Sequence, residues 1–139
     1  YLKGVSLRLL AKFIDRYSNL APMLHHISDK ESEALNLAKD YMMNNLFSVF
    51  PGVLFLAEIS GMSVTKFKFL FKKRFVSTPK NFFLREKMIL ANELLKSENF
   101  MKLSDVAREL SYSKPSLFSG VYFQQFGRKP SEDFVSSNY

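Results

Sequence analysis

The sequence predicts an all-α fold in which one pair of helices occurs twice, with a single helix joining the two pairs. The main observation is an internal repeat, because residues 56–83 and 106–134 carry the same pattern about fifty positions apart. The composition agrees, since 5 glycines and 5 prolines among 139 residues are too few for a loop-rich or β-rich fold. The 47% of apolar residues, with 15 phenylalanines among them, are sufficient for a core.

Each repeat places a turn residue and a serine between two apolar stretches. Gly61 matches Ser111 and Ser63 matches Ser113 at one offset, whereas later positions match at an offset one residue larger. These later pairs are Phe67 with Phe118, Phe71 with Tyr122, Pro79 with Pro130 and Phe83 with Phe134. A short helix, a tight turn, a serine cap and a second amphipathic helix are together typical of a helix-turn-helix. Two such units in a basic chain indicate binding to duplex DNA.

The elements of the first unit follow from caps and apolar spacing. Ser28 and Glu31 form a capping box that begins a helix. The apolar face of this helix is expected to hold Leu35, Ala38, Tyr41, Met42 and Leu46. A short helix over about 53–60 leads to Gly61, which favours a positive φ, and Ser63 then caps a helix that continues to about residue 75.

Thr78 and Pro79 begin the central helix, because a capping residue followed by proline at the first helical position is a favoured start. The helix extends to about residue 96, which is roughly 25 Å, and its apolar face holds Phe83, Met88, Ala91, Leu94 and Leu95. In the second repeat we expect Ser104 to cap the leading helix, Ser113 to cap its partner, and a final short helix to follow Pro130.

These elements divide the chain into an upstream part and a DNA-binding domain. Residues 28–139 hold the first helix-turn-helix at about 28–78, the linker helix at about 79–97 and the second helix-turn-helix at about 102–136. Residues 1–27 are expected to be the tail of a missing N-terminal domain plus a linker. The reasons are the helical apolar pattern of residues 2–17 and a first residue, Tyr1, that is not methionine.

The positive charge is concentrated in the middle of the chain. The net charge is +7, and residues 51–101 hold nine basic and four acidic side chains, so five of the seven excess charges fall there. This clustering fits a surface that faces phosphates better than the alternative, a solvated surface that happens to be basic.

Composition and spacing argue against several other classes of function. The chain has no cysteine, so it has neither a disulfide nor a thiolate zinc site, which suits the cytoplasm. No apolar run approaches the roughly 18 residues needed to span a bilayer. The adjacent His25 and His26 do not share a helix face, and no glycine-rich phosphate loop or Ser/His/Asp arrangement is apparent. We therefore predict no catalysis, no metal, no cofactor and no membrane partner.

Three stretches carry a resemblance to a known family. They read LA-x3-GMS-x3-F-x3-FKK from residue 56, Ala91-x2-LeuLeu in the central helix, and VA-x3-SYS-x4-F-x3-Y-x4-G-x2-P-x3-F from residue 106. In motif order and spacing the chain resembles the AraC/XylS family of bacterial transcription regulators over about residues 31–134. The resemblance implies two helix-turn-helix units whose second helices enter the major groove one DNA turn, about 34 Å, apart. It also implies RNA polymerase as a partner, and an N-terminal effector-binding or dimerisation domain through which the protein forms homodimers.

Four positions depart from the family pattern. Ser111 precedes Tyr112 where the family usually has glycine, and Val76 replaces the usual glycine after the first recognition helix. Lys87 replaces a typical arginine in the central helix, and Gly120 replaces a common base-reading arginine in the second recognition helix.

The first recognition helix has two chemically different sides. The three-four spacing directs Phe67, Leu70, Phe71, Arg74 and Phe75 inward and directs Thr65, Lys66, Lys68, Phe69, Lys72 and Lys73 outward. The resemblance implies that Thr65, Lys68, Phe69 and Lys72 face DNA. Lys68 suits guanine, Phe69 suits a thymine methyl group, and Lys72 and Lys73 suit phosphates. In the alternative, Phe69 packs against a neighbouring domain and the lysines serve solubility.

The second recognition helix carries fewer groups that can read bases. Leu117, Phe118, Val121 and Tyr122 are expected in the core, whereas Lys114, Pro115, Ser116, Ser119 and Gly120 are expected to face DNA, with Arg128 and Lys129 on phosphates. We therefore expect the first unit to dominate specificity. The alternative function is a degenerate helix-turn-helix that contacts RNA polymerase or another regulator.

Overall fold

The computed structural model describes residues 26–137, and this part of the chain forms seven α-helices and no strand. In chain order they are α2 (Asp29–Asn44), α3 (Val53–Ile59), α4 (Val64–Phe75), α5 (Pro79–Lys96), α6 (Leu103–Glu109), α7 (Pro115–Phe126) and α8 (Pro130–Asp133). The predicted upstream helix lies outside the described residues, as does most of the predicted linker. Over the described residues the all-α prediction is confirmed.

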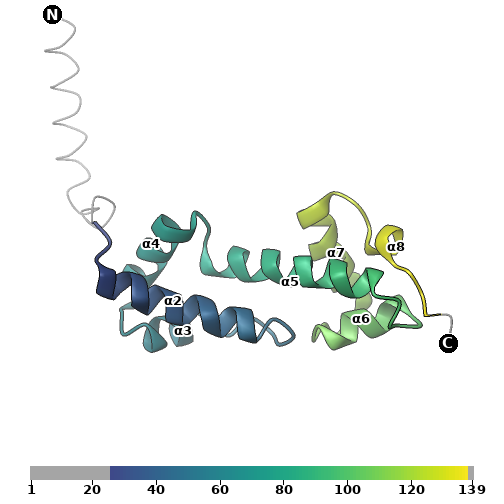
Figure 1. Cartoon of the computed structure of the whole chain (residues 1–139), viewed down its shortest axis with the longest axis horizontal. Coiled ribbons are helices and arrows are strands. Elements are labelled where there is room, and N and C mark those ends of the chain that lie inside the picture. The colour runs from purple at the N-terminus through teal and green to yellow at the C-terminus, as the bar shows by residue number, and fades with distance from the viewer. Residues whose placement is uncertain (1–25, 138–139) are drawn as a thin grey trace, which may run out of the picture.

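α5 runs through the middle of the molecule, and a group of helices packs on each half of it (Figure 1). One core lies between α2, α3, α4 and the first turns of α5, where Phe82 and Phe83 are buried. The other lies between α6, α7 and the rest of α5, where Met88, Ala91 and Leu95 are buried. The architecture is therefore two helix-turn-helix units joined by one helix, as the repeat predicts.

The caps of the first unit agree with the sequence. The Ser28 hydroxyl accepts a hydrogen bond from the Glu31 amide at 3.1 Å, and the Glu31 carboxylate accepts one from the Ser28 amide at 3.1 Å. Ser63 accepts from the Lys66 amide at 3.2 Å and starts α4. Thr78 caps α5 in the same way, with proline at the first helical position. The start of each of these helices was therefore predictable from local sequence.

The caps expected in the second unit are wrong. Lys102 rather than Ser104 precedes α6, Lys114 rather than Ser113 precedes α7, and neither lysine side chain makes a capping hydrogen bond. Pro115 explains the start of α7, because the residue before a proline is restricted to extended backbone, and Lys114 has φ −139° and ψ 138°. At α6 the Lys102 carbonyl already accepts a backbone hydrogen bond, so Ser104 lies inside the first turn.

Most residues of the predicted apolar faces are buried, with exceptions at their edges. Tyr41 is partly exposed at the edge of α2, where its ring lies 4.9 Å from that of Phe55. Arg74 is exposed rather than packed inward, because its guanidinium keeps its hydration and donates to the Asn36 side chain at 3.4 Å. Leu117, expected in the second core, is 52% exposed, because it lies on the side of α7 turned away from α5 and α6.

A charged side chain lies between the two cores. Lys87 is only 3% exposed, because it falls four residues after Phe83 and four before Ala91 and so shares the inward side of α5. Its ammonium donates to the Ser48 carbonyl at 2.6 Å, which satisfies one of its N–H groups. Burial lowers the pKa of Lys87 to about 8.

We predict that the free energy of unfolding increases above pH 8 because of Lys87. The folded chain releases the Lys87 proton near pH 8, whereas the unfolded chain holds it up to the ordinary pKa of 10.5. Between these two pKa values the unfolded state binds more protons than the folded state, so the free energy of unfolding rises with pH. Below both values Lys87 is charged in the folded state, and the full penalty of burying its ammonium is present. Urea unfolding from about pH 7.5 to about pH 10.5 should show this rise relative to Lys87→Met. If the difference in free energy of unfolding between the parent and Lys87→Met stays constant over this pH range, the prediction is contradicted.

Candidate nucleic-acid interface

α4 buries one side and presents the other to solvent. Phe67, Leu70 and Phe71 are buried in the first core. The opposite side holds one half-buried residue, Phe69, and a group of exposed residues: Thr65, Lys66, Lys68, Lys72 and Lys73. Apart from Arg74, α4 is therefore divided as its spacing predicts.

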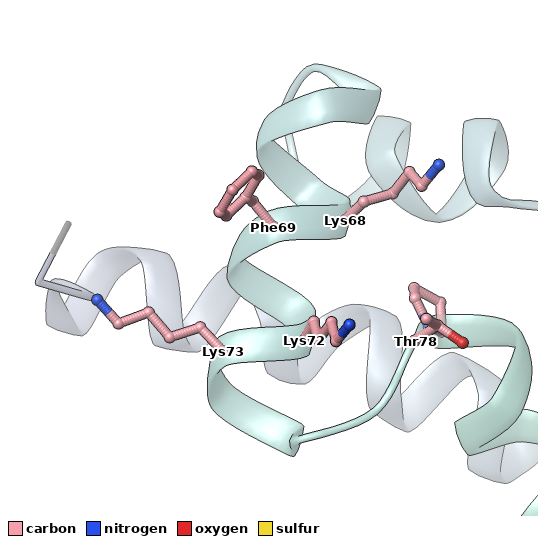
Figure 2. A pocket seen from close by; sticks show the side chains of 6 residues that line it. Lys68, Phe69, Lys72, Lys73 and Thr78 are labelled. Atoms are coloured by element: carbon pink, nitrogen blue, oxygen red, sulfur yellow. The ribbon is translucent and has the colours of Figure 1, made fainter. Parts of the chain in front are cut away.

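A hollow of about 550 Å³ adjoins the exposed side of α4 at the start of α5. Its lining residues are Lys68, Phe69, Lys72, Lys73, Thr78 and Pro79. Figure 2 shows Lys68 and Lys72 extending toward the side on which Thr78 lies, whereas Phe69 and Lys73 extend the other way. Two ammonium groups one helical turn apart, beside the positive end of the α5 dipole, suit an anion such as a phosphate.

Two other basic residues of α4 turn toward α2 instead. Lys66 forms an ion pair with Glu31 at 3.0 Å, and Glu31 is also the residue that completes the cap of α2. Arg74 donates to Asn36, also on α2. The spacing predicts Lys66 among the residues that contact DNA, and in the structure its ammonium is paired inside the first unit.

The charges of Lys68 and Lys72 are not neutralised within the unit. Over residues 26–137 neither ammonium lies within ion-pair distance of a carboxylate. Both side chains are exposed and lie on the same helix face. This face of α4 therefore attracts anions, most strongly at low ionic strength.

α7 exposes a face of different chemistry. Pro115, Ser116 and Gly120 are exposed, Ser119 is half-buried, and Lys114 is exposed just before the helix. A second hollow of about 420 Å³ adjoins this face and is lined by Leu103, Ser119, Gly120, Phe123, Lys129, Pro130 and Ser131. A Cβ added at Gly120 would meet no atom within 4 Å, so packing does not require a glycine there.

Two apolar residues lie unexpectedly on the exposed face of α7. Leu117 is 52% exposed and Phe123 is 53% exposed. Phe123 follows the outward-facing Ser119 by four residues, so helical spacing was the available signal for it. The exposed face of α7 thus offers hydroxyl and apolar groups where α4 offers ammonium groups.

Arg128 takes part in the packing of the second unit. Its Nε donates to an Asp133 carboxylate oxygen at 2.7 Å, and the Tyr122 hydroxyl donates to the same oxygen at 2.5 Å. The hydrogen bond from Tyr122, together with Arg128, holds the pKa of Asp133 below its usual value. The hydrogen bond from Tyr122 to Asp133 ties α8 to α7, and Arg128 adds a second contact to Asp133 from the loop between the two helices. The predicted contact of Arg128 with phosphate stays a prediction. Lys129, in contrast, lines the hollow beside α7.

The described residues contain neither a metal-binding cluster nor a membrane-spanning helix. Between residues 26 and 137, histidines and carboxylates do not gather into a group of three or more suited to a metal ion. None of the helices α2 to α8 combines the length and the apolar character needed to cross a membrane.

Comparison with known proteins gives both sequence and structural relatives. A family described as a helix-turn-helix domain matches residues 56–134, the span of the two repeats. The virulence regulon transcriptional activator VirF of Yersinia enterocolitica is 28% identical over 131 residues, which cover 94% of this chain and 46% of VirF. The chain thus spans less than half the length of this relative.

Two solved structures share the fold. The C-terminal domain of AraT, a response regulator from Geobacillus stearothermophilus, matches with a TM-score of 0.68 and 17% identity, covering 83% of this chain and 94% of that domain. The DNA-binding domain of AdpA, solved in complex with a target DNA, matches with a TM-score of 0.64 and 22% identity, covering 70% of this chain and 86% of that domain. At these identities the likeness establishes the arrangement of helices.

We predict that Gly120→Ala raises the free energy of unfolding by about 0.5–1 kcal/mol. Gly120 lies inside α7, where alanine has the higher helix propensity, and the added methyl group meets open space. Gly127→Ala is the matched control and should destabilise the protein, because Gly127 has a φ of 69°. Thermal and urea unfolding measure both variants. A destabilising Gly120→Ala would mean that α7 uses this glycine for its own packing.

Proposed function

The chain belongs to the AraC/XylS-type helix-turn-helix family, and on that basis we propose that it is a sequence-specific transcription regulator that binds double-stranded DNA. The observation that carries the proposal is the pair of uncompensated lysines, Lys68 and Lys72, on the exposed face of α4. In the proposed complex α4 and α7 are the recognition helices and occupy successive major grooves.

The arrangement of the helices supports two groove contacts. α4 lies near the N-terminal end of α5 and α7 lies over its C-terminal half, and the C-terminal ends of α4 and α7 lie on the same side of α5 (Figure 1). The 18 residues of α5 give it a length of about 27 Å. A separation of about 34 Å between groove centres is required for two helices on one face of B-DNA, and α4 and α7, packed on the two halves of α5, are proposed to meet it.

The chemistry of α4 suits both base reading and backbone contact. Lys68 would donate to guanine O6 or N7, and Phe69, which extends to the other side of α4, would contact a thymine methyl group. Lys72 and Lys73 would contact phosphates, which orient the helix without reading sequence. Thr65, exposed in the first turn, would add one hydroxyl at the bases. The first unit is therefore proposed to dominate specificity.

The second unit is proposed to contribute mainly affinity and shape recognition. Ser116 and Ser119 can hydrogen-bond with several bases, and Gly120 has no side chain to read any of them. Lys114 and Lys129 flank α7 and would contact phosphates on either side of it. The half-site under α7 would then be only weakly specified by base contacts, and its sequence would be selected mainly by how easily the DNA there can be deformed.

A second function for α7 is favoured by its exposed apolar side chains. Leu117 and Phe123 are both more than half exposed, and apolar groups are common in the centres of protein interfaces. In this alternative, α7 contacts RNA polymerase or another regulator while α4 holds the DNA. VirF is named a transcriptional activator, which is compatible with both arrangements. For the whole protein we propose a cytoplasmic regulator whose N-terminal part mediates effector binding or homodimer formation.

We predict that duplex binding weakens steeply as salt is added. Each phosphate contact contributes about −0.9 to the slope of log K against log salt, so the four proposed contacts, from Lys72, Lys73, Lys114 and Lys129, give a slope of about −3.6. Fluorescence anisotropy with a labelled duplex across a salt series measures it. A slope near zero, or no binding at low salt, would exclude nucleic acid as the partner.

We predict that Lys68→Ala changes sequence preference, whereas Lys66→Ala does not. The loss of Lys68 should cost about 1–3 kcal/mol on the preferred site and relax the preference at one base pair. Lys66 is the matched control, because it carries the same charge on the same helix but pairs with Glu31. Lys72→Ala should weaken all duplexes alike. Site selection from a random duplex pool, followed by affinity measurement, gives the readout. If Lys68→Ala weakens binding to the preferred site and to random DNA by the same factor, the assigned role of Lys68 is refuted.

A further inference from the structure

The two helix-turn-helix units also touch away from the packed helices. The loop between α2 and α3, residues 45–52, meets the turn between α6 and α7. There the Ser111 hydroxyl donates to the Phe47 carbonyl at 2.6 Å, across 64 positions of the chain. This contact joins the first unit directly to the second.

The next carbonyl of the same loop is held by the central helix. The Lys87 ammonium donates to the Ser48 carbonyl at 2.6 Å. The ammonium also lies 5.4 Å from the centroid of the Phe83 ring and 5.0 Å from that of Tyr112. Tyr112 belongs to the turn of the second unit, and its buried hydroxyl has no hydrogen-bond partner within residues 26–137. Its ring, rather than its hydroxyl, therefore makes the contact at this boundary.

The backbone conformation of Ser111 would suit glycine better than serine, which points to a role for the Ser111 hydroxyl. Ser111 has a φ of 66°, close to the 65° of Gly61 at the matching turn of the first unit. Glycine adopts this conformation without strain, whereas a residue with a Cβ does not. A serine here keeps the strain and adds the hydroxyl that reaches Phe47.

We propose that Ser111 and Lys87 are positioning residues that clamp the 45–52 loop to the second unit and so fix the orientation of α7 relative to α4. A helix such as α5 can bend or twist along its length, and the clamp adds a second connection beside it. The consequence for DNA rests on the proposed function: the clamp would restrict the spacing between half-sites that one molecule can occupy.

The orientation of the units can be measured without DNA. The chain has no cysteine, so Glu33→Cys on α2 and Glu109→Cys on α6, both exposed, accept one spin label each. Pulsed electron paramagnetic resonance should give a narrow distribution of distances between the two spin labels in this double-cysteine protein, which serves as the parent. Adding Ser111→Gly, Ser111→Ala or Lys87→Met should broaden it. For Ser111, losing one ordinary hydrogen bond should raise the ratio of open to clamped molecules roughly fivefold.

Val76→Gly is the matched control. Val76 has a φ of 59° and is exposed at the end of α4, so this change relieves similar strain without touching the 45–52 loop. It should leave the distance distribution unchanged. If Ser111→Gly and Ser111→Ala leave the distribution as narrow as that of the parent, the clamp is refuted and Ser111 is only a turn residue.

A second measurement uses duplexes whose half-sites are one base pair closer or farther apart than the selected site. The parent should bind both altered duplexes more weakly than the selected site, and for Ser111→Gly this loss of affinity should be roughly fivefold smaller. Broadened distances with no duplex binding by any of the proteins would support the clamp and refute the DNA-binding function. Normal binding with unchanged distances and unchanged spacing dependence would refute the clamp and leave the DNA-binding function standing.

Discussion

α5 contributes buried side chains to both cores, and this sharing constrains everything else in the structure. Phe82 and Phe83 pack with the first unit, whereas Met88, Ala91 and Leu95 pack with the second. Because interiors are closely packed, neither unit can shift along α5 without opening a cavity in its own core. The distance between α4 and α7 therefore follows from the positions along α5 at which the two units pack, and the repeated sequence yields a repeated arrangement in space.

A charged side chain, Lys87, lies at the boundary between the two cores. Lys87 interrupts the apolar series on the inward side of α5, and a buried ammonium requires hydrogen-bond acceptors. The Ser48 carbonyl supplies one such acceptor, and this hydrogen bond holds the loop after α2 against the middle of α5. Two departures from the family pattern, Lys87 and Ser111, thus meet at one place, although 24 residues separate them in the sequence.

The two exposed helices have diverged in chemistry while keeping the same fold. Phe67 and Phe71 of α4 are matched in the second core by Phe118 and Tyr122 of α7, and all four are buried. The outward positions are free of this packing requirement, so they differ: ammonium groups on α4, and hydroxyl and apolar groups on α7. Larger differences on the exposed faces than in the cores are expected where a common scaffold presents two different contacts.

The sequence by itself determined the helices, their order and the two buried faces, because caps and three-four spacing are local properties. It failed at Ser113, where the effect of Pro115 on the preceding residue outweighed the preference of serine for a cap. Only the tertiary structure decided which outward residues have partners, since Lys66 meets Glu31 and Arg128 meets Asp133 across different elements. A charge on a helix surface looks the same in sequence whether a carboxylate from another element lies beside it or not. That difference arises only when the chain folds.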